Sequence, residues 1–485
     1  MKNIKVALKT TISLFFIVTL CCGGTAQETG INRINKEQKL YELSVVWKEL
    51  SYNFANMDNC PDVNLDSLYR EYMVIVQNTE NDWEYWKSMN RFLCHFNSSH
   101  VYCRQHPEYF YDYLGFLLLT TTYQDNKILV ENIGTHNADK IKIGDEIVMV
   151  NDMPVLDYLQ EYSIPYIPAT NDESKTIHQA TFGGGSQINI SLRNEALKFG
   201  MKTLKGIENV TIAYDKYFNP SPKDTAEQKK RRYLDAGASK HFDFMRENLF
   251  LEDKVNDFAF IRLTRCDMSF ASFFDEHYDQ IMQYGNLIID VHYNEGGSSD
   301  VTWHPIQCLI NNDTIYTYPE KTRVNNALYR AWASIKILLY EDKDVPEYHK
   351  ENFYPYYYDT AFEEINQGKN AYPSGVPDSL RYKGNVYVII GENNGSAGEY
   401  FVAMLSQNKD ITFLGKKTIG AFGQPLLVSL PSGIEVLINT TKSYDFRGQD
   451  ISSGFPPDYE FDFSEIFKIN DQQEMLGRLI HEIMR

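Results

Sequence analysis

Ser396 lies where a serine hydroxyl could act as a nucleophile. The segment GENNGSAGEYFVAML, residues 391–405, follows the apolar run NVYVII and ends in YFVAML, so it predicts a turn between a buried strand and a helix. A serine on a glycine-flanked turn of this kind lies beside helix amides that can stabilise an oxyanion. Ser396 and Glu399 also spell Ser-x-x-Glu, the pattern of a helix capping box. These four residues alone fit both roles, nucleophile and cap.

A pair of glycines supplies candidate oxyanion donors. In NLIIDVHYNEGGSSD, residues 286–300, a buried strand ending at Asp290 opens into Gly296 and Gly297. Glycines after a strand allow backbone amides to approach a ligand closely, although a plain tight turn also fits the pattern. If Ser396 attacks a carbonyl, the amide of Gly296 or Gly297 and that of Ala397 would form the oxyanion hole, at about 3 kcal/mol per donor.

A serine nucleophile also needs a base, most often a histidine. The chain has 11 histidines, most of which we expect to be structural or exposed. His100 differs through its context, because FNSSHVY, residues 96–102, is a polar loop that leaves an amphipathic helix and places Ser98 and Ser99 beside the ring.

The surrounding elements fall into three regions. Residues 35–96 have a helical pattern, with one apolar stripe formed by Trp83, Trp86, Met89, Phe92, Leu93 and Phe96. Short β-type runs then predict a compact β-rich module up to about residue 194, and residues 200–240 are polar and basic, which indicates an exposed connection. Beyond it, strands alternate with helices, which predicts an α/β core.

Six sequence blocks, in this order, resemble the peptidase family of tail-specific (C-terminal processing) proteases and the tricorn core protease. They are Asn-Ser-Ser-His at 97–100, the PDZ-like block ADKIKIGDEIVMVNDMPVLDYL, Asp-x-x-x-Asn-x-Gly-Gly at 290–297, Ser-Ala-Gly-Glu at 396–399, Gly-x-x-Thr-x-Gly at 415–420 and Gly-x-x-Pro-Asp at 454–458. The resemblance implies a crotonase-like α/β catalytic core with an N-terminal helical region and an inserted PDZ-like domain. The expected boundaries are 1–26 for a signal peptide, 27–106, 107–200 and 201–485.

The resemblance also implies catalytic roles. Members with a Ser–Lys dyad carry lysine directly after Gly-x-x-Thr-x-Gly, where this chain has Ala421. Tricorn-like members use the histidine of the Ser-His loop, which implies Ser396 as nucleophile and His100 as base, with Ser99 assisting. The glutamate that orients the base in those members is missing, and Asp450, one position away, is the candidate acid. Lys416 and Lys417 would serve as bases only after a loop rearrangement. The carboxylate-binding loop of the PDZ-like domain would lie at Leu114, Gly115 and Phe116.

Composition and the N-terminus restrict partners and location. A formal charge of -18 argues against nucleic-acid binding. Lys2, Lys5 and Lys9 precede the apolar run TISLFFIVTL, which predicts a secretory signal peptide. Cleavage before Gln27 is favoured over lipid attachment at Cys21 or Cys22, since Leu20 stands where a small residue is usual. The five remaining cysteines fit buried small residues rather than a disulfide framework or zinc site.

The sequence therefore predicts an exported serine endopeptidase, periplasmic or secreted, that acts on polypeptides without a metal or organic cofactor. The alternative is a catalytically inactive peptide-binding protein on the same fold, and the oligomeric state stays open.

Overall fold

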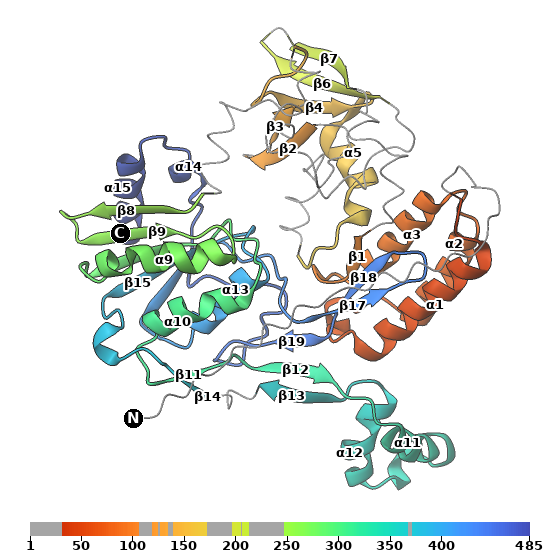
Figure 1. Ribbon diagram of the computed structural model, residues 1–485. Coiled ribbons are helices and arrows are strands. Elements are labelled where there is room, and N and C mark those ends of the chain that lie inside the picture. Colours follow the sequence, from red (N-terminus) through yellow and green to blue (C-terminus); the bar gives the residue numbers. More distant parts are fainter. Residues whose placement is uncertain are drawn as a thin grey trace, which may run out of the picture.

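The computed structural model describes residues 32–105, 119–124, 127–133, 139–171, 196–204, 206–212, 247–366 and 371–485 (Figure 1). The predicted signal peptide and the predicted carboxylate-binding loop at Leu114, Gly115 and Phe116 lie outside the described residues. In the described ranges, no helix combines the length and apolar character needed to cross a membrane.

The N-terminal region is helical, as predicted. It contains α1 (Lys36–Asn53), the short η1 (Met57–Asn59), α2 (Leu65–Gln77) and α3 (Asp82–Cys94). Each α-helix begins after an asparagine, Asn35, Asn64 or Asn81, whose side chain accepts a backbone N–H of the first turn. All six residues of the predicted apolar stripe are buried.

These helices pack on a small sheet that also contains C-terminal chain. Strand β1 (Tyr102–Gln105) pairs antiparallel with β18 (Glu435–Asn439), which pairs with β17 (Pro425–Ser429). The carboxylate of Glu42 in α1 accepts the backbone N–H of Ser432 at 2.7 Å. The helical region and the C-terminal region are therefore parts of one packed unit, with Leu430, Ile434, Val436 and Ile438 in their common core.

A β-rich module follows, and it extends further than predicted. Its sheet has the order β2 (Leu119–Gln124), β3 (Lys127–Ile133), β4 (Glu146–Val150), β6 (Leu197–Thr203) and β7 (Gly206–Ile212), with β5 (Met153–Pro154) on β4. The helices are α5 (Val155–Tyr162) and η4 (Ile164–Tyr166). The boundary at 200 was wrong, because Leu197, Phe199 and Met201 alternate into this core and β7 pairs with β6 up to Ile212.

The central sheet positions the candidate catalytic loops. Its order is β20 (Tyr459–Glu460), β16 (Ile411–Gly415), β15 (Asn385–Ile390), β10 (Asn286–Asp290), β9 (Phe258–Arg262) and β8 (Leu249–Asp253), and only β8 is antiparallel to its neighbour. Residues of α9 (Met268–Ile281), α10 (Trp303–Leu309) and α13 (Ala397–Leu405) form the core on one face, whereas α14 (Ser464–Phe467) and α15 (Gln472–Ile483) cover the other. This arrangement confirms the predicted mixed α/β architecture.

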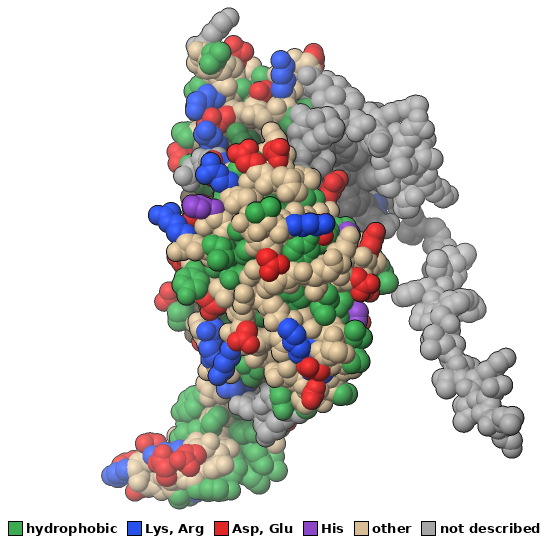
Figure 2. Space-filling view, turned by 90° about the vertical axis from the view of Figure 1, so that its left-hand side faces the viewer, with side chains coloured by type: hydrophobic (Ala, Val, Ile, Leu, Met, Phe, Trp, Pro, Cys, Tyr) green, Lys and Arg blue, Asp and Glu red, His purple; other side chains and the backbone are tan. Residues whose placement is uncertain are grey.

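An arm that the sequence did not predict projects from this core (Figure 1). Strands β12 (Glu320–Arg323), β13 (Phe362–Asn366) and β19 (Thr441–Ser443) form its base, and α11 (Ala327–Leu339), η7 (Asp342–Asp344) and α12 (Glu347–Tyr357) form its tip. Leu338 and Tyr348 on this arm are 71% and 65% exposed. Hydrophobic side chains are visible on the surface of the molecule in Figure 2. Strands β11 (Thr314–Tyr316) and β14 (Ala371–Pro373) pair beside α10, and the described ranges also contain η6 (Ser299–Thr302) and η8 (Asp378–Leu380).

Candidate active site

Ser396 sits on a strained turn between β15 and α13. Its backbone has φ 50° and ψ −119°, a region that residues with a Cβ rarely adopt. Such a conformation costs on the order of 1–3 kcal/mol and persists only where the surroundings impose it. Ser396 and Glu399 form the capping box that the sequence predicts, in which the carboxylate of Glu399 accepts a hydrogen bond from the backbone N–H of Ser396. The roles of helix cap and nucleophile therefore do not exclude each other at this turn.

Glu399 is what holds this turn. Its fully buried carboxylate accepts the backbone N–H of Ser396 at 3.1 Å and those of Gly420 and Ala421 at 2.8 Å, together with the hydroxyl of Thr418. Burial raises the pKa of Glu399 to about 7, against the opposing effect of these hydrogen bonds. The cap expected from the sequence thus also ties the Ser396 turn to the loop 418–423.

The paired glycines lie beside Ser396 because β10 and β15 are parallel neighbours, so the loops after them meet at one edge of the sheet. Gly395 donates its N–H to the carbonyl of Asn294 at 2.8 Å. A Cβ on Gly296, whose φ is +98°, would lie 2.7 Å from the Cβ of Ser396. Glycine is therefore required here for close approach.

The two glycine amides differ in availability. The N–H of Gly296 donates to the side chain of Asn294 at 2.9 Å, so it serves the turn. Across the described ranges, the N–H groups of Gly297 and Ala397 donate to no protein acceptor. Of the three expected donors, the N–H groups of Gly297 and Ala397 are therefore available to an oxyanion, whereas the N–H of Gly296 is already bonded within the turn.

His100 contacts the loop 418–423, which also binds Glu399. Its Nδ1 is 3.1 Å from the carbonyl oxygen of Gly423. A carbonyl only accepts, so Nδ1 carries the proton and Nε2 keeps its lone pair. Burial lowers the pKa of His100 below its usual 6.5, and hydrogen bonds to the carbonyls of Gly423 and Phe422 oppose that effect. The ring is therefore neutral at pH 7 and has the protonation state of a general base.

Ser99 reaches the same loop through Thr170. The Thr170 hydroxyl receives the backbone N–H of Ser99 at 2.9 Å, lies 2.9 Å from the Ser99 hydroxyl and donates to the carbonyl of Gly420 at 2.7 Å. Loop 418–423 thus connects His100, Ser99 and, through Glu399, Ser396. No hydrogen bond between Ser396 and His100 is present among the described residues, and such bonds often form only with substrate bound.

Asp450 is not in the place expected for it. Its carboxylate accepts the backbone N–H of Ser452 at 2.8 Å and lies 3.8 Å from the ammonium of Lys442. The hydrogen-bond partner of Nδ1 of His100 is the Gly423 carbonyl instead. The expectation that Asp450 orients His100 was wrong, because Asp450 is exposed and paired within its own turn.

Neither alternative lysine is poised as a base. Lys416 forms ion pairs with Glu392 at 2.8 Å and Asp462 at 3.1 Å, and Lys417 donates to the hydroxyl of Ser453 at 3.0 Å. Ala421, where a dyad lysine would stand, is buried and donates its N–H to Glu399. This arrangement favours His100.

Two contributors were not found from the sequence. Gly423 contributes its backbone carbonyl, which any residue has, so no residue type in the sequence points to it. Thr170 lies 71 residues from Ser99 in the sequence, and only the fold brings the two hydroxyls together. Cys60, Cys103, Cys266 and Cys308 are buried free thiols, as expected, and Cys94 is partly buried. Over the ranges that the structure describes, no three or more His, Cys, Asp or Glu side chains are grouped to hold a metal ion.

Comparisons with known proteins relate the chain to peptidases. The model of peptidase family S41 matches residues 257–461. Mature CPAF complexed with lactacystin superposes with a TM-score of 0.60 at 14% identity, over 92% of this chain and 97% of that chain, a likeness of fold. The photosystem II D1 C-terminal processing protease has a TM-score of 0.43 at 11% identity, over 91% of this chain and 96% of that chain. The tricorn protease has a TM-score of 0.41 at 14% identity, over 93% of this chain and 37% of that chain. No curated protein matches the sequence.

The family match contains the loops with Gly296, Gly297 and Ser396, whereas His100 comes from the N-terminal helical region. The chain carries a peptidase family S41 domain, the domain of a serine peptidase.

Proposed function

We propose that this serine peptidase is an exported endopeptidase that cleaves polypeptides through an acyl-enzyme, with Ser396 as nucleophile and His100 as general base. The observation that carries the proposal is the strained Ser396 turn, whose φ of 50° is imposed by Glu399 and which lies beside the available amides of Gly297 and Ala397. A cap serine needs no such strain, because N-cap residues ordinarily adopt extended backbone angles.

The chemistry follows from this arrangement. Oγ of Ser396 attacks the scissile carbonyl while Nε2 of His100 takes its proton, and the carbonyl oxygen becomes an oxyanion that accepts the N–H groups of Gly297 and Ala397. The imidazolium then protonates the leaving amine, the C–N bond breaks, and the acyl group remains on Ser396. Water attacks the acyl carbon, His100 takes the water proton, and the released Ser396 oxygen receives it.

The substrate class and location form part of the same proposal. The β-rich module, which resembles a PDZ domain around Gly144–Val155, would hold an extended segment of the polypeptide near the site. Export is supported by the lysines and apolar run at residues 2–20. The protein would act in the periplasm or outside the cell, with lipid attachment at Cys21 or Cys22 as the alternative to free release.

A peptide-binding protein without catalysis is the second candidate. The observation that favours it is the orienting group of His100, a backbone carbonyl instead of a carboxylate. A carbonyl fixes the tautomer, but it stabilises the imidazolium formed during the reaction less than a carboxylate does.

The test is digestion of unfolded casein by the mature chain beside Ser396→Ala and His100→Ala, with mass spectrometry of the products. Cleavage by the wild type that both substitutions abolish supports the peptidase. An inactive wild type that still binds peptides would support the second candidate.

A further inference from the structure

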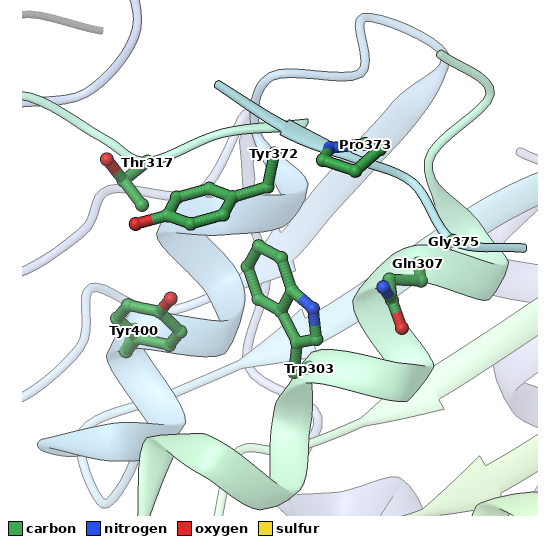
Figure 3. A pocket seen from close by; sticks show the side chains of 7 residues that line it. All are labelled: Trp303, Gln307, Thr317, Tyr372, Pro373, Gly375 and Tyr400. Carbon is green, nitrogen blue, oxygen red and sulfur yellow. The ribbon is translucent and has the colours of Figure 1, made fainter. Parts of the chain in front are cut away.

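A pocket with three aromatic rings in its lining lies beside α13 (Figure 3). It has a volume of about 530 Å³. Trp303, Tyr372 and Tyr400 contribute rings, and the rings of Trp303 and Tyr372 meet edge to face with centroids 5.5 Å apart. The remaining lining residues are Gln307, Thr317, Pro373 and Gly375.

The pocket shares secondary-structure elements with the catalytic loops. Tyr400 donates its backbone N–H to the carbonyl of Ser396 at 2.9 Å, so it lies one helical turn after the nucleophile. Trp303 begins α10 only six residues after Gly297. Tyr318 then contacts both Tyr400 and Phe422, with ring centroids 5.7 and 6.1 Å apart, and Phe422 precedes the residue that binds His100.

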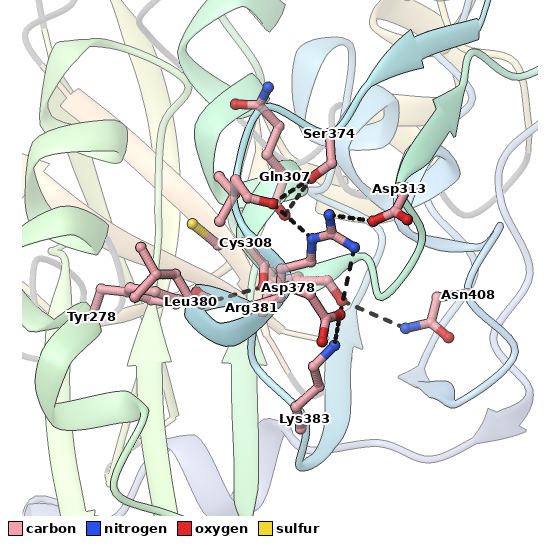
Figure 4. Close-up of polar contacts among 12 residues, drawn as sticks. Tyr278, Gln307, Cys308, Asp313, Ser374, Asp378, Leu380, Arg381, Lys383 and Asn408 are labelled. Carbon is pink, nitrogen blue, oxygen red and sulfur yellow. Dashed lines mark hydrogen bonds and ion pairs between the residues drawn. The ribbon is translucent and has the colours of Figure 1, made fainter.

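The wall opposite Tyr400 is preformed. The buried guanidinium of Arg381 donates to the carbonyl of Val376 at 2.9 Å and to the carboxylate of Asp313 at 2.8 Å (Figure 4). Ser374, within the same strand-to-turn segment, donates its N–H to the carbonyl of Asp313 at 2.9 Å. These bonds hold Pro373 and Gly375 against α10 without a ligand.

The lining chemistry selects the ligand. No residue in the lining carries a charge, so a charged side chain would lose its hydration without gaining an ion pair. An aromatic ring instead gains edge and face contacts with Trp303, Tyr372 and Tyr400. The hydroxyl oxygen of Thr317 is buried and has no hydrogen-bond partner among the described residues, which also suits the phenol of a tyrosine.

We propose that this pocket is a specificity subsite that receives a phenylalanine or tyrosine side chain of the substrate polypeptide. The inference rests on the proposed function, because it places the substrate beside Ser396. It assigns Trp303 and Tyr372 as specificity-determining residues.

The test uses paired peptides that differ only in Phe, Ala or Glu at the position where the casein products show a fixed preference. We expect kcat/KM for the Phe peptide to exceed that for the Ala peptide at least tenfold. Tyr372→Ala and Trp303→Ala should each reduce this ratio to about threefold or less. Tyr372 is 45% exposed, so its truncation should leave the fold intact. Trp332→Ala on the arm, where the side chain is also exposed, is the matched control and should leave the ratio unchanged.

Two further measurements separate this inference from the proposed function. Labelling of Ser396 by a small fluorophosphonate should proceed equally in wild type and in the control Trp332→Ala, since the reagent tests the nucleophile without needing the pocket. Calorimetric binding of the Phe and Ala peptides to Ser396→Ala tests the pocket without catalysis, and Phe should bind at least tenfold more tightly. The subsite alone is overturned if cleavage or binding shows no preference for the Phe peptide. It is also overturned if Tyr372→Ala and Trp303→Ala leave such a preference unchanged. If the wild type is neither labelled nor able to cleave, but Ser396→Ala still binds the Phe peptide more tightly than the Ala peptide, only the proposed catalysis is overturned.

Discussion

The carboxylate of Glu399 accepts the backbone N–H of Ser396 at 3.1 Å while it also accepts two amides of the loop that follows β16. One buried side chain therefore couples the nucleophile turn to the loop that holds His100. The contact explains how Ser396 keeps its φ of 50°, because the turn cannot relax without breaking buried hydrogen bonds.

Glu399→Gln should disrupt this coupling. The amide NH2 would face backbone N–H donors that now find no acceptor, which should lower the free energy of unfolding by about 1–3 kcal/mol. Urea unfolding and kcat measured on the same preparation check this, and kcat should fall in protein that is still folded. Glu392→Gln, which removes only a partly exposed ion pair with Lys416, is the control and should cost less than about 1 kcal/mol.

The pH dependence of stability gives a second measure of the same group. Because the pKa of Glu399 is raised from 4.5 to about 7, its protonation stabilises the fold fully below pH 4.5. That contribution is lost as the pH rises to about 7. The difference in unfolding free energy between wild type and Glu399→Gln should therefore change across pH 4.5–7 and be constant above it. A difference independent of pH in that window would contradict the raised pKa.

His100 should determine the acidic limb of the activity profile. The base must be neutral to accept the proton of Ser396, and burial lowers its pKa below 6.5. We expect kcat/KM to be constant near pH 7 and to fall on acidification with a midpoint under 6.5. His100→Ala should reduce kcat by about 10²- to 10⁴-fold and abolish this limb. A midpoint clearly above 6.5 would argue against His100 as the base.

Gly296→Ala should misplace the nucleophile. The new methyl group would lie 2.7 Å from both the carbonyl oxygen of Gly395 and the Cβ of Ser396, so the turn must shift. A displacement of this size costs on the order of 100-fold in kcat/KM. Gly448→Ala is the matched control, because Gly448 also has positive φ, +84°, but meets open space. It should cost about 1–2 kcal/mol of stability and leave kcat/KM unchanged.

Local patterns predicted the parts of the site that local sequence determines. Ser396, Gly296 and Gly297 follow buried strands, and neighbouring parallel strands bring such loops together without further information. The orienter of His100 could not be predicted this way, because a backbone carbonyl has no residue signature and Gly423 lies 323 residues away. Asp450 was selected by its position in the chain, which carries no information on side-chain direction.

The elements missed in the fold share a similar cause. Strands β6 and β7 were assigned in part to a connection because polar residues are interspersed with the apolar ones in 200–212, although the two strands pair along this stretch. The arm of α11 and α12 leaves apolar residues exposed, so hydrophobic pattern alone did not distinguish it from core.

Asp290 provides a test of what stabilises the central sheet. Its buried carboxylate pairs with Arg262 at 2.6 Å and with His292, whose ring stacks on Phe467 with centroids 4.3 Å apart. Burial alone would raise the pKa of Asp290, but the charges and hydrogen bonds of His292 and Arg262 outweigh it and bring the pKa to about 2.

Asp290→Asn should therefore leave the buried Arg262 charge without its carboxylate, at about 3–5 kcal/mol in the free energy of unfolding. Asp275→Asn, which breaks a half-exposed pair with His304, should cost less than about 1 kcal/mol. A depressed pKa also means that Asp290 contributes its full stability above pH 3.8 and loses it as the pH falls to about 2. Acid titration of unfolding in wild type and Asp290→Asn should show the two stabilities converging in that window, and parallel curves would mean that the pair does not determine acid stability.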